Sequence, residues 1–182
     1  MDEAFIKKVQ PNSPEAEQSV IGAMIMDRDA IADVIDIVSA DDFYQKQNGI
    51  LFEAMTELYR EGKPVDLVTL QNKLKKKDVP ESMKSLEFIR DLLEAVPTSA
   101  NAKQYAKIVS EKATLRKLIK VTEDITTECY LGKDDVTEIL DHTEKNVFGL
   151  LQQASGREDF VPIDKVVLNT LDAIEEAASS EG

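Results

Sequence analysis

The chain has 182 residues, of which 42% are hydrophobic and 31% are charged, a balance typical of a globular protein and not of a disordered one. Its formal net charge is −13, from 35 acidic and 22 basic residues, and this acidic excess argues against a surface that binds nucleic-acid phosphates. Seven glycines, six prolines and no tryptophan argue against an all-β fold rich in tight turns.

A single cysteine and the lack of long apolar runs limit the setting in which the chain works. Cys129 cannot form a disulfide within the chain, which favours a reducing compartment. Residues 1–8 lack the apolar stretch of a signal peptide, and no window approaches the roughly 18 apolar residues that a membrane-spanning helix needs. We therefore expect a cytoplasmic protein that does not enter a membrane.

The first part of the chain predicts a compact helical head over residues 1–100. Ser13 and Pro14 predict a helix start, because a hydroxyl can cap free N–H groups and proline suits the first helical position. Gly62 marks the end of a later helix, after which Asp66 can cap the next one. A last helix before Pro97 carries an apolar stripe at Leu86, Ile89, Leu92 and Leu93.

A different pattern begins after the head. Residues 101–130 contain neither proline nor glycine, and apolar residues recur at helical spacing along them. Gly132 can end this helix and Asp134 can cap a second one. The apolar positions of the second helix are Val136, Ile139, Leu140, Val147, Leu150 and Leu151. The pattern predicts an αα-hairpin over residues 101–154.

Two features of this organisation indicate contacts beyond one copy of the chain. Two amphipathic helices cover each other on one side only, so an outer stripe must bury against the head or a second copy. Residues 155–182 predict a polar linker followed by one short amphipathic helix, which should have a docking partner. The expected docking face of that helix is Val167, Leu168, Leu171 and Ile174.

A nucleotide site finds no support in the glycine pattern. A P-loop needs glycines that let backbone N–H groups approach phosphate, followed by Lys and Ser or Thr. Gly132-Lys133 is followed by Asp134, which would repel phosphate, and Gly62-Lys63 is followed by proline. We expect no ATP site, and no other cofactor site, within these residues.

Metal and acid–base chemistry are also poorly supported. One histidine and one cysteine cannot furnish a typical zinc site. Glu138 and His142 are four residues apart and are interpreted as a surface pair on one helix. The densest basic run, from Lys73 to Lys77, is interpreted as a solvated helix end that the helix dipole favours. We expect no catalytic residue and no metal ligand in this stretch.

Five phrases of the sequence resemble the N-terminal domain of the DnaB replicative helicase family. They are PNSPEAEQSVIG (11–22), DDFY (41–44), GKPVDLVTL (62–70), VPTSAN (96–101) and YAKIV (105–109). Each segment alone is a weak indication of this family, but the five segments in this order are specific for it. Residues 163–176 also resemble the linker helix of that family.

The resemblance implies a hexamer of two tiers. The N-terminal tier is a collar of helical heads and hairpins, arranged as a trimer of dimers. The C-terminal tier is a RecA-like motor that hydrolyses ATP with Mg²⁺ and translocates 5′ to 3′ on single-stranded DNA. The linker helix docks on the motor of a neighbouring subunit. On this basis the chain is the collar and linker, and the motor lies outside it.

The resemblance also implies partners. The collar of this family binds the C-terminal helicase-binding domain of primase, and loader proteins engage DnaB-type hexamers, usually through other surfaces. Candidate primase contacts are Phe88, which falls off its helix stripe, and Ile119 and Ile125 on the first hairpin helix. The alternative is that all three pack in the head, the hairpin or a dimer contact. Residues 80–85 depart from the Gly-Gly turn and aromatic that the family often carries there.

Three alternatives stay open. The chain could be a stand-alone helical interaction domain, a helical enzyme with an unrecognised site, or a nucleic-acid-binding module acting on its own. The composition argues against the enzyme, and the acidic charge predicts little direct binding to DNA.

Overall fold

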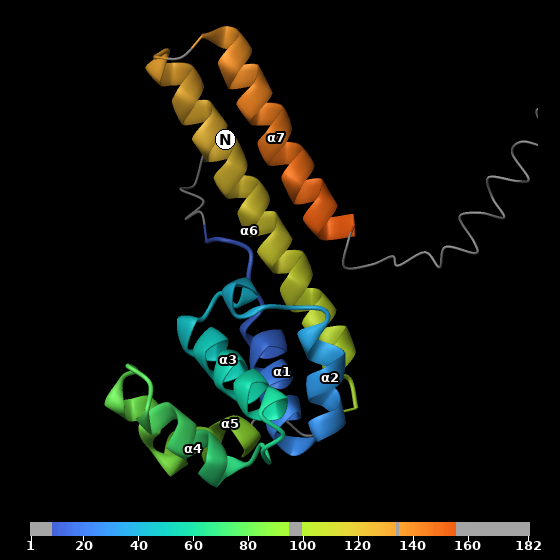
Figure 1. The fold of residues 1–182 in the computed structure, drawn as a ribbon, viewed down its shortest axis with the longest axis vertical. Helices are drawn as coiled ribbons and strands as arrows, with labels where there is room; N and C mark the ends of the chain where they lie inside the picture. The colour runs from blue at the N-terminus through green and yellow to red at the C-terminus, as the bar shows by residue number, and fades with distance from the viewer. Residues whose placement is uncertain (1–8, 95–99, 134, 156–182) are drawn as a thin grey trace, which may run out of the picture.

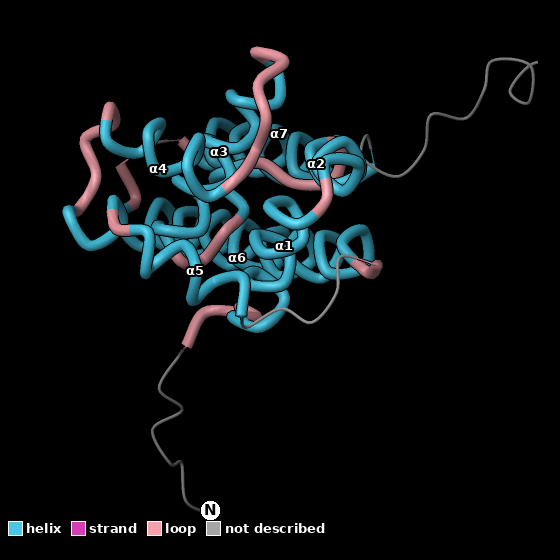
Figure 2. Tube along the Cα trace, turned by 90° about the horizontal axis from the view of Figure 1, so that it is seen from below, coloured by secondary structure: helices cyan, strands magenta, loops and turns pink. Residues whose placement is uncertain are grey.

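The computed structural model describes residues 9–94, 100–133 and 135–155 of the chain. Within these ranges every regular element is a helix, as Figure 2 shows, so the all-α prediction is confirmed. The α-helices are α1 (Pro14–Met26), α2 (Arg28–Ile35), α3 (Lys46–Arg60), α4 (Leu67–Lys75), α5 (Leu86–Glu94), α6 (Ala102–Leu131) and α7 (Val136–Ser155). Two short 3-10 helices, η1 (Ala40–Asp42) and η2 (Glu81–Lys84), lie between them.

Local sequence signals fix several helix ends. The Ser13 hydroxyl accepts a hydrogen bond from the Ala16 N–H at 3.4 Å, with proline at the first helical position. The Asp66 carboxylate accepts from two backbone N–H groups at the start of α4. Gly62 and Gly132 take positive φ angles of 69° and 55°, the left-handed conformation that ends α3 and α6. The expected cap Asp134 lies outside the described residues.

The head is built around α1. This helix contacts α2, α3, α5 and the first part of α6, so it is surrounded by other helices (Figure 1). Eight large apolar side chains of the head are fully buried: Ile21, Met24, Ile31, Leu51, Met55, Leu70, Leu74 and Ile89. Burial of each stabilises the fold by about 1.5–3 kcal/mol. These side chains form the core of the molecule.

Helix α6 connects the head to the hairpin. Its 30 residues give it a length of about 45 Å, and it extends out of the head while α7 runs back antiparallel beside it (Figure 1). Its buried residues, Ala102, Ala106, Val109 and Ala113, all lie in the half that contacts the head. Along 136–152 of α7, no side chain is fully buried. The hairpin therefore has no closed core of its own among the described residues.

Candidate protein-interaction surface

The outer part of α6 carries a strip without charged side chains. Apart from the adjacent pair at 118 and 119, its successive members lie three or four residues apart, which places them on one side of the helix. They are Leu115, Leu118, Ile119, Thr122, Thr126 and Cys129. Leu115, Leu118 and Cys129 are exposed, and Ile119 is half-buried. A strip this long without charge is unusual on an exposed helix, because 31% of the residues of the chain are charged.

Helix α7 carries a matching row of exposed apolar residues. Val136, Leu140 and Leu151 are 68%, 63% and 58% exposed, and the half-buried Val147 lies between them in the same row. A second row on α7 faces α6 and is half-buried: Ile139, Thr143, Asn146 and Leu150. Apart from the exposed Phe148, the apolar residues of this helix thus occupy two rows, of which α6 covers only one.

The two exposed rows lie on the same side of the hairpin. On α6 the row facing α7 includes Val121, Ile125 and Glu128, and Glu128 contacts His142 of α7. On each helix, most residues of the exposed row come one position after a residue of the row that faces the other helix. One position along an α-helix is a rotation of about 100° around its axis. Because the helices are antiparallel, these two rotations of equal sign point to the same side. We name this apolar surface, made by the strip on α6 and the exposed row on α7, the free face.

The expected primase contacts do not form one cluster. Phe88 is half-buried on α5, where it packs against the core of the head. Ile119 lies on the free face, whereas Ile125 is half-buried in the row that faces α7. In Figure 1, α5 lies at the end of the head far from the hairpin. The role of these residues in binding primase stays a prediction, and the expected docking residues Val167, Leu168, Leu171 and Ile174 lie outside the described residues.

The apolar positions predicted for α7 belong to both of its rows. The exposed Val136, Leu140 and Leu151 stand in that single pattern together with the half-buried Ile139 and Leu150. The signal that distinguishes them is the helical spacing: 136, 140, 147 and 151 make one row, and 139, 143, 146 and 150 make another. Sorting the pattern into rows would have located the free face.

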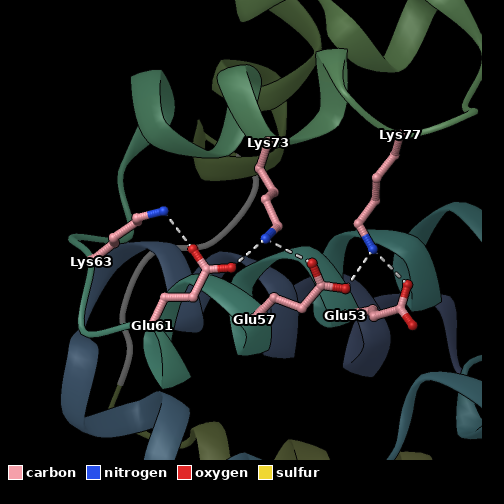
Figure 3. A network of polar contacts seen from close by, with 6 residues as sticks. All are labelled: Glu53, Glu57, Glu61, Lys63, Lys73 and Lys77. Carbon is pink, nitrogen blue, oxygen red and sulfur yellow. Dashed lines mark hydrogen bonds and ion pairs between the residues drawn. The ribbon is translucent and has the colours of Figure 1, made fainter.

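A ladder of ion pairs joins α4 to α3 (Figure 3). Lys73 donates to Glu57 at 2.8 Å and to Glu61 at 2.7 Å. Lys77 donates to Glu53 at 2.8 Å and to Glu57 at 2.7 Å. The three glutamates are one helical turn apart along α3, so each lysine reaches two of them.

The ladder shifts the titration of its members. Hydrogen bonds from Lys63 and Lys73 lower the pKa of Glu61 from 4.5 to about 2. Hydrogen bonds from Lys73 and Lys77 also lower the pKa of Glu57. The same contacts with Glu57 and Glu61 raise the pKa of Lys73 above 10.5. All these groups are therefore charged across the neutral range.

The ladder corrects the interpretation of the basic run as a solvated helix end. Lys73 and Lys77 are largely covered and each pairs with two carboxylates, because α4 packs with this side against α3. Lys75 and Lys76 are exposed. Two of the four lysines of the run therefore have a structural role in the head, which leaves two exposed lysines that could meet phosphate groups.

The single histidine also has a different partner from the one that the spacing predicted. His142 Nδ1 lies 3.0 Å from a carboxylate oxygen of Glu128 on α6, and its other ring nitrogen lies 3.2 Å from the Asn146 amide. The predicted pair with Glu138 is wrong, because His142 lies on the side of α7 that faces α6. The contact helps to join the two hairpin helices near their turn.

The described residues form neither a metal-binding cluster nor a membrane-spanning helix. In the described ranges, no three His, Cys, Asp or Glu side chains are grouped so that they could hold a metal ion. None of the described helices is both long and apolar enough to span a membrane.

Residues 9–111 match the family described as DnaB-like helicase N terminal domain, and this match covers more than half of the chain. The chain belongs to this family. It is 33% identical over 182 residues to the replicative DNA helicase DnaB of Geobacillus stearothermophilus, a match that covers all of this chain and 40% of the relative. The chain therefore spans less than half the length of the DnaB relatives that it matches.

Solved structures of DnaB N-terminal domains have the same fold. The domain from Mycobacterium tuberculosis superposes with a TM-score of 0.73 and 34% identity, covering 78% of this chain and 99% of that one. The domain from Helicobacter pylori, described together with its interactions with primase, superposes with a TM-score of 0.56 and 24% identity, covering 64% and 90% of the two chains. At that identity the second likeness concerns the fold alone.

Proposed function

We propose that this chain is the collar module of a hexameric replicative DNA helicase. In this proposal the hairpin pairs copies of the chain through the free face, and the head carries the docking surface for primase. The single observation that supports pairing most directly is the free face itself, where exposed apolar residues of both hairpin helices lie on one side.

Physical arguments favour a second copy as the occupant of the free face. Contiguous exposed apolar surface is a mark of protein–protein contact. A two-fold contact uses the same patch on both copies, so one uncharged strip is enough for both sides. The uncharged strip on α6 also limits the repulsion that two copies with a net charge of −13 would otherwise meet. Dimers formed in this way are the units of the proposed trimer of dimers.

The primase assignment is supported by the family. The related domain from Helicobacter pylori is described with its interactions with primase, and the resemblance set out above names the C-terminal helicase-binding domain of primase as partner. Phe88, Ile119 and Ile125 stay the candidate contacts. A loader protein is a further proposed partner, and we propose little direct binding of DNA to these residues.

The remaining parts of the proposal concern the whole helicase in the cytoplasm. Residues 1–100 are the head, residues 101–154 the hairpin, and residues 155–182 a linker whose helix docks on a neighbouring motor. ATP and Mg²⁺ belong to the RecA-like motor, which unwinds DNA. These statements rest on the family, since the chain spans about 40% of its relative.

The mass of the purified chain in solution tests the pairing. We expect light scattering to show a mass that rises toward a dimer or hexamer with concentration. Leu140→Glu places a charge on the free face and should weaken association at least about tenfold, a change of ~1.4 kcal/mol. Val68→Glu is the matched control, because Val68 is 59% exposed but lies on α4 of the head.

Either of two results would count against the pairing. One is a monomeric mass at every concentration, and the other is an equal effect of Leu140→Glu and Val68→Glu. A chain that associates can then be titrated with the C-terminal domain of primase, and loss of binding in Phe88→Ala with unchanged mass would assign that contact to the head.

A further inference from the structure

Two basic residues hold the head at the point where α6 leaves it. Ala113 is the last fully buried residue of α6, and Arg116 and Lys117 lie on the following turn. The Arg116 guanidinium donates to the carbonyl oxygens of Pro11 and Asp42, both at 2.6 Å. The Lys117 ammonium donates to the Asp42 carboxylate at 2.8 Å. We call these three hydrogen bonds the clamp.

The acceptors of the clamp belong to a segment that the head holds firmly. Asp42 is fully buried, and its second carboxylate oxygen accepts from the N–H and hydroxyl of Ser39 at 2.8 and 2.9 Å. The buried Glu17 of α1 accepts from the N–H groups of Tyr44 and Gln45 at 2.6 and 3.1 Å. Residues 39–45 are thus fixed to α1 on one side and to α6 on the other.

The apolar contact between α6 and the head ends at Ala113. The fully buried side chains of α6 are Ala102, Ala106, Val109 and Ala113, and the half-buried Tyr105 and Ile108 also pack against the core. Beyond Ala113 no side chain of α6 is fully buried, so polar contacts provide the attachment to the head there. The polar clamp lies at this outer end of the apolar contact, where it has the most effect on the orientation of the hairpin.

The geometry of the clamp suits it to fix an angle. The planar guanidinium of Arg116 reaches two head segments that are far apart in the sequence, so it resists rotation about either bond alone. The Cζ atom of the Arg116 guanidinium lies 5.6 Å from the centre of the Tyr44 ring. This adds a cation–π contact with residues 39–45. Lys117 adds an attachment to the buried carboxylate of Asp42.

We propose that Arg116 and Lys117 are positioning residues that fix the orientation of the head relative to the hairpin. In a single chain, this orientation depends on no partner. A second consequence rests on the proposed function. When hairpins are paired in a collar, the clamp determines where each head, and any primase surface on it, lies relative to the pair.

The distance between two spin labels tests the clamp within a single chain. One label is placed on Cys129, the only cysteine of the sequence, which is exposed on the hairpin. The other is placed on Arg60→Cys at the exposed end of α3. The labelled chain is diluted in a large excess of unlabelled chain, so that only distances within one chain are measured. Pairing of copies is not needed.

In the parent chain we expect a single narrow distribution of label-to-label distances. In the double variant Arg116→Met/Lys117→Met this distribution should become broader or split. Methionine keeps the apolar stem of each side chain and removes its charge. Lys117→Arg should keep the narrow distribution because it retains the charge beside Asp42. Lys120→Met is the matched control: Lys120 pairs with Asp124 at 3.3 Å on the exposed surface of the same helix.

An unchanged distribution in the double variant, with helical content retained, would overturn the inference, and so would equal broadening in Lys120→Met. Where the double variant loses helical content, Lys117→Met alone is judged by the same criterion. Because Cys129 lies on the free face, pairing is judged from the mass of the unlabelled parent chain. An unlabelled chain that stays monomeric, with a narrow distribution in the labelled one, counts against the proposed pairing and leaves the clamp intact. Failure of the two proposals is therefore distinguishable.

Discussion

The head and the hairpin are both made of amphipathic helices, yet they bury their apolar side chains to very different degrees. In the head, α1 is surrounded by other helices, and large side chains such as Ile21 and Leu51 are fully buried. In the hairpin, α7 contacts α6, and Leu140 stays 63% exposed. An apolar stripe is therefore buried only where the fold supplies enough neighbouring helices to cover it.

The largest expected difference between the two regions comes from removing a leucine from each. Leu51→Ala in the head should lower the free energy of unfolding by about 2–5 kcal/mol, because it leaves a cavity in a closed core. Leu140→Ala in the hairpin should change it by less than about 0.5 kcal/mol in the monomer. Urea denaturation followed by circular dichroism at low protein concentration measures both, and similar losses would contradict the comparison.

Two glycines in helices provide a second test of the contrast between the head and the hairpin. A Cβ at Gly49 would lie 2.5 Å from the backbone oxygen of Ala40, so Gly49→Ala should destabilise the head by ~1–3 kcal/mol. A Cβ at Gly149 of α7 meets nothing within 4 Å, so Gly149→Ala should stabilise the chain by up to about 1 kcal/mol through helix propensity. The midpoint of thermal unfolding should therefore fall in Gly49→Ala and rise in Gly149→Ala. A stabilising Gly49→Ala would show that η1 and α3 can separate without cost.

The buried carboxylate of Glu17 provides a third test, on polar groups. Glu17→Gln should destabilise the head by about 1–2 kcal/mol, because the amide keeps one acceptor oxygen but brings N–H donors toward the backbone N–H groups of Tyr44 and Gln45. Glu15→Gln, on the exposed side of the same helix, is the control and should have little effect. Urea midpoints compare the two variants, and equal midpoints would contradict the role given to Glu17.

The smallest expected effect is the pH dependence of the ion-pair ladder. The pKa of Glu61 falls from 4.5 to about 2 in the folded chain. Its contribution to the free energy of unfolding is therefore fully present above pH 4.5 and is lost as the pH falls through about 2. The pKa of Lys73 is raised above 10.5, so its contribution is present below that pH and is lost as the pH rises through the raised value. The ladder should therefore stabilise the head evenly between about pH 5 and 10.

The difference in urea midpoint between the parent and Lys73→Met measures this contribution. It should be constant across the neutral range and shrink at both extremes. Lys75→Met, which removes an exposed lysine of the same helix, should show no such profile. A difference that grows as the pH falls below 4 would contradict the assignment.

The sequence predicted those parts of the fold that depend on residues close together in the chain. The cap at Ser13, the cap at Asp66 and the left-handed turn at Gly132 are local, and each was predicted from a few neighbouring residues. The helical periodicity likewise predicted the hairpin, since α6 and α7 carry the expected apolar positions.

Contacts between segments that are far apart in the chain could not be predicted in the same way. The partner of His142 depends on which side of α7 faces α6, and the spacing suggested Glu138 where the structure has Glu128. The bonds from Arg116 to Pro11 and Asp42 join segments 105 and 74 residues apart, and no local pattern marks them. The free face was present in the periodicity, but its exposure became evident only once α7 was placed beside α6.

The continuity of α6 has a consequence for the kinetics of local opening. One helix passes from a closed core, where Ala106 and Val109 are buried, to a surface where the side chains of Tyr130 and Leu131 are exposed. Backbone amides in its first half should exchange hydrogen with solvent only when the head unfolds, whereas those near its end should exchange through fraying of the hairpin alone. Protection should thus fall along a single uninterrupted helix. If copies pair through the free face, the outer half should gain protection on assembly, while the half within the head changes little.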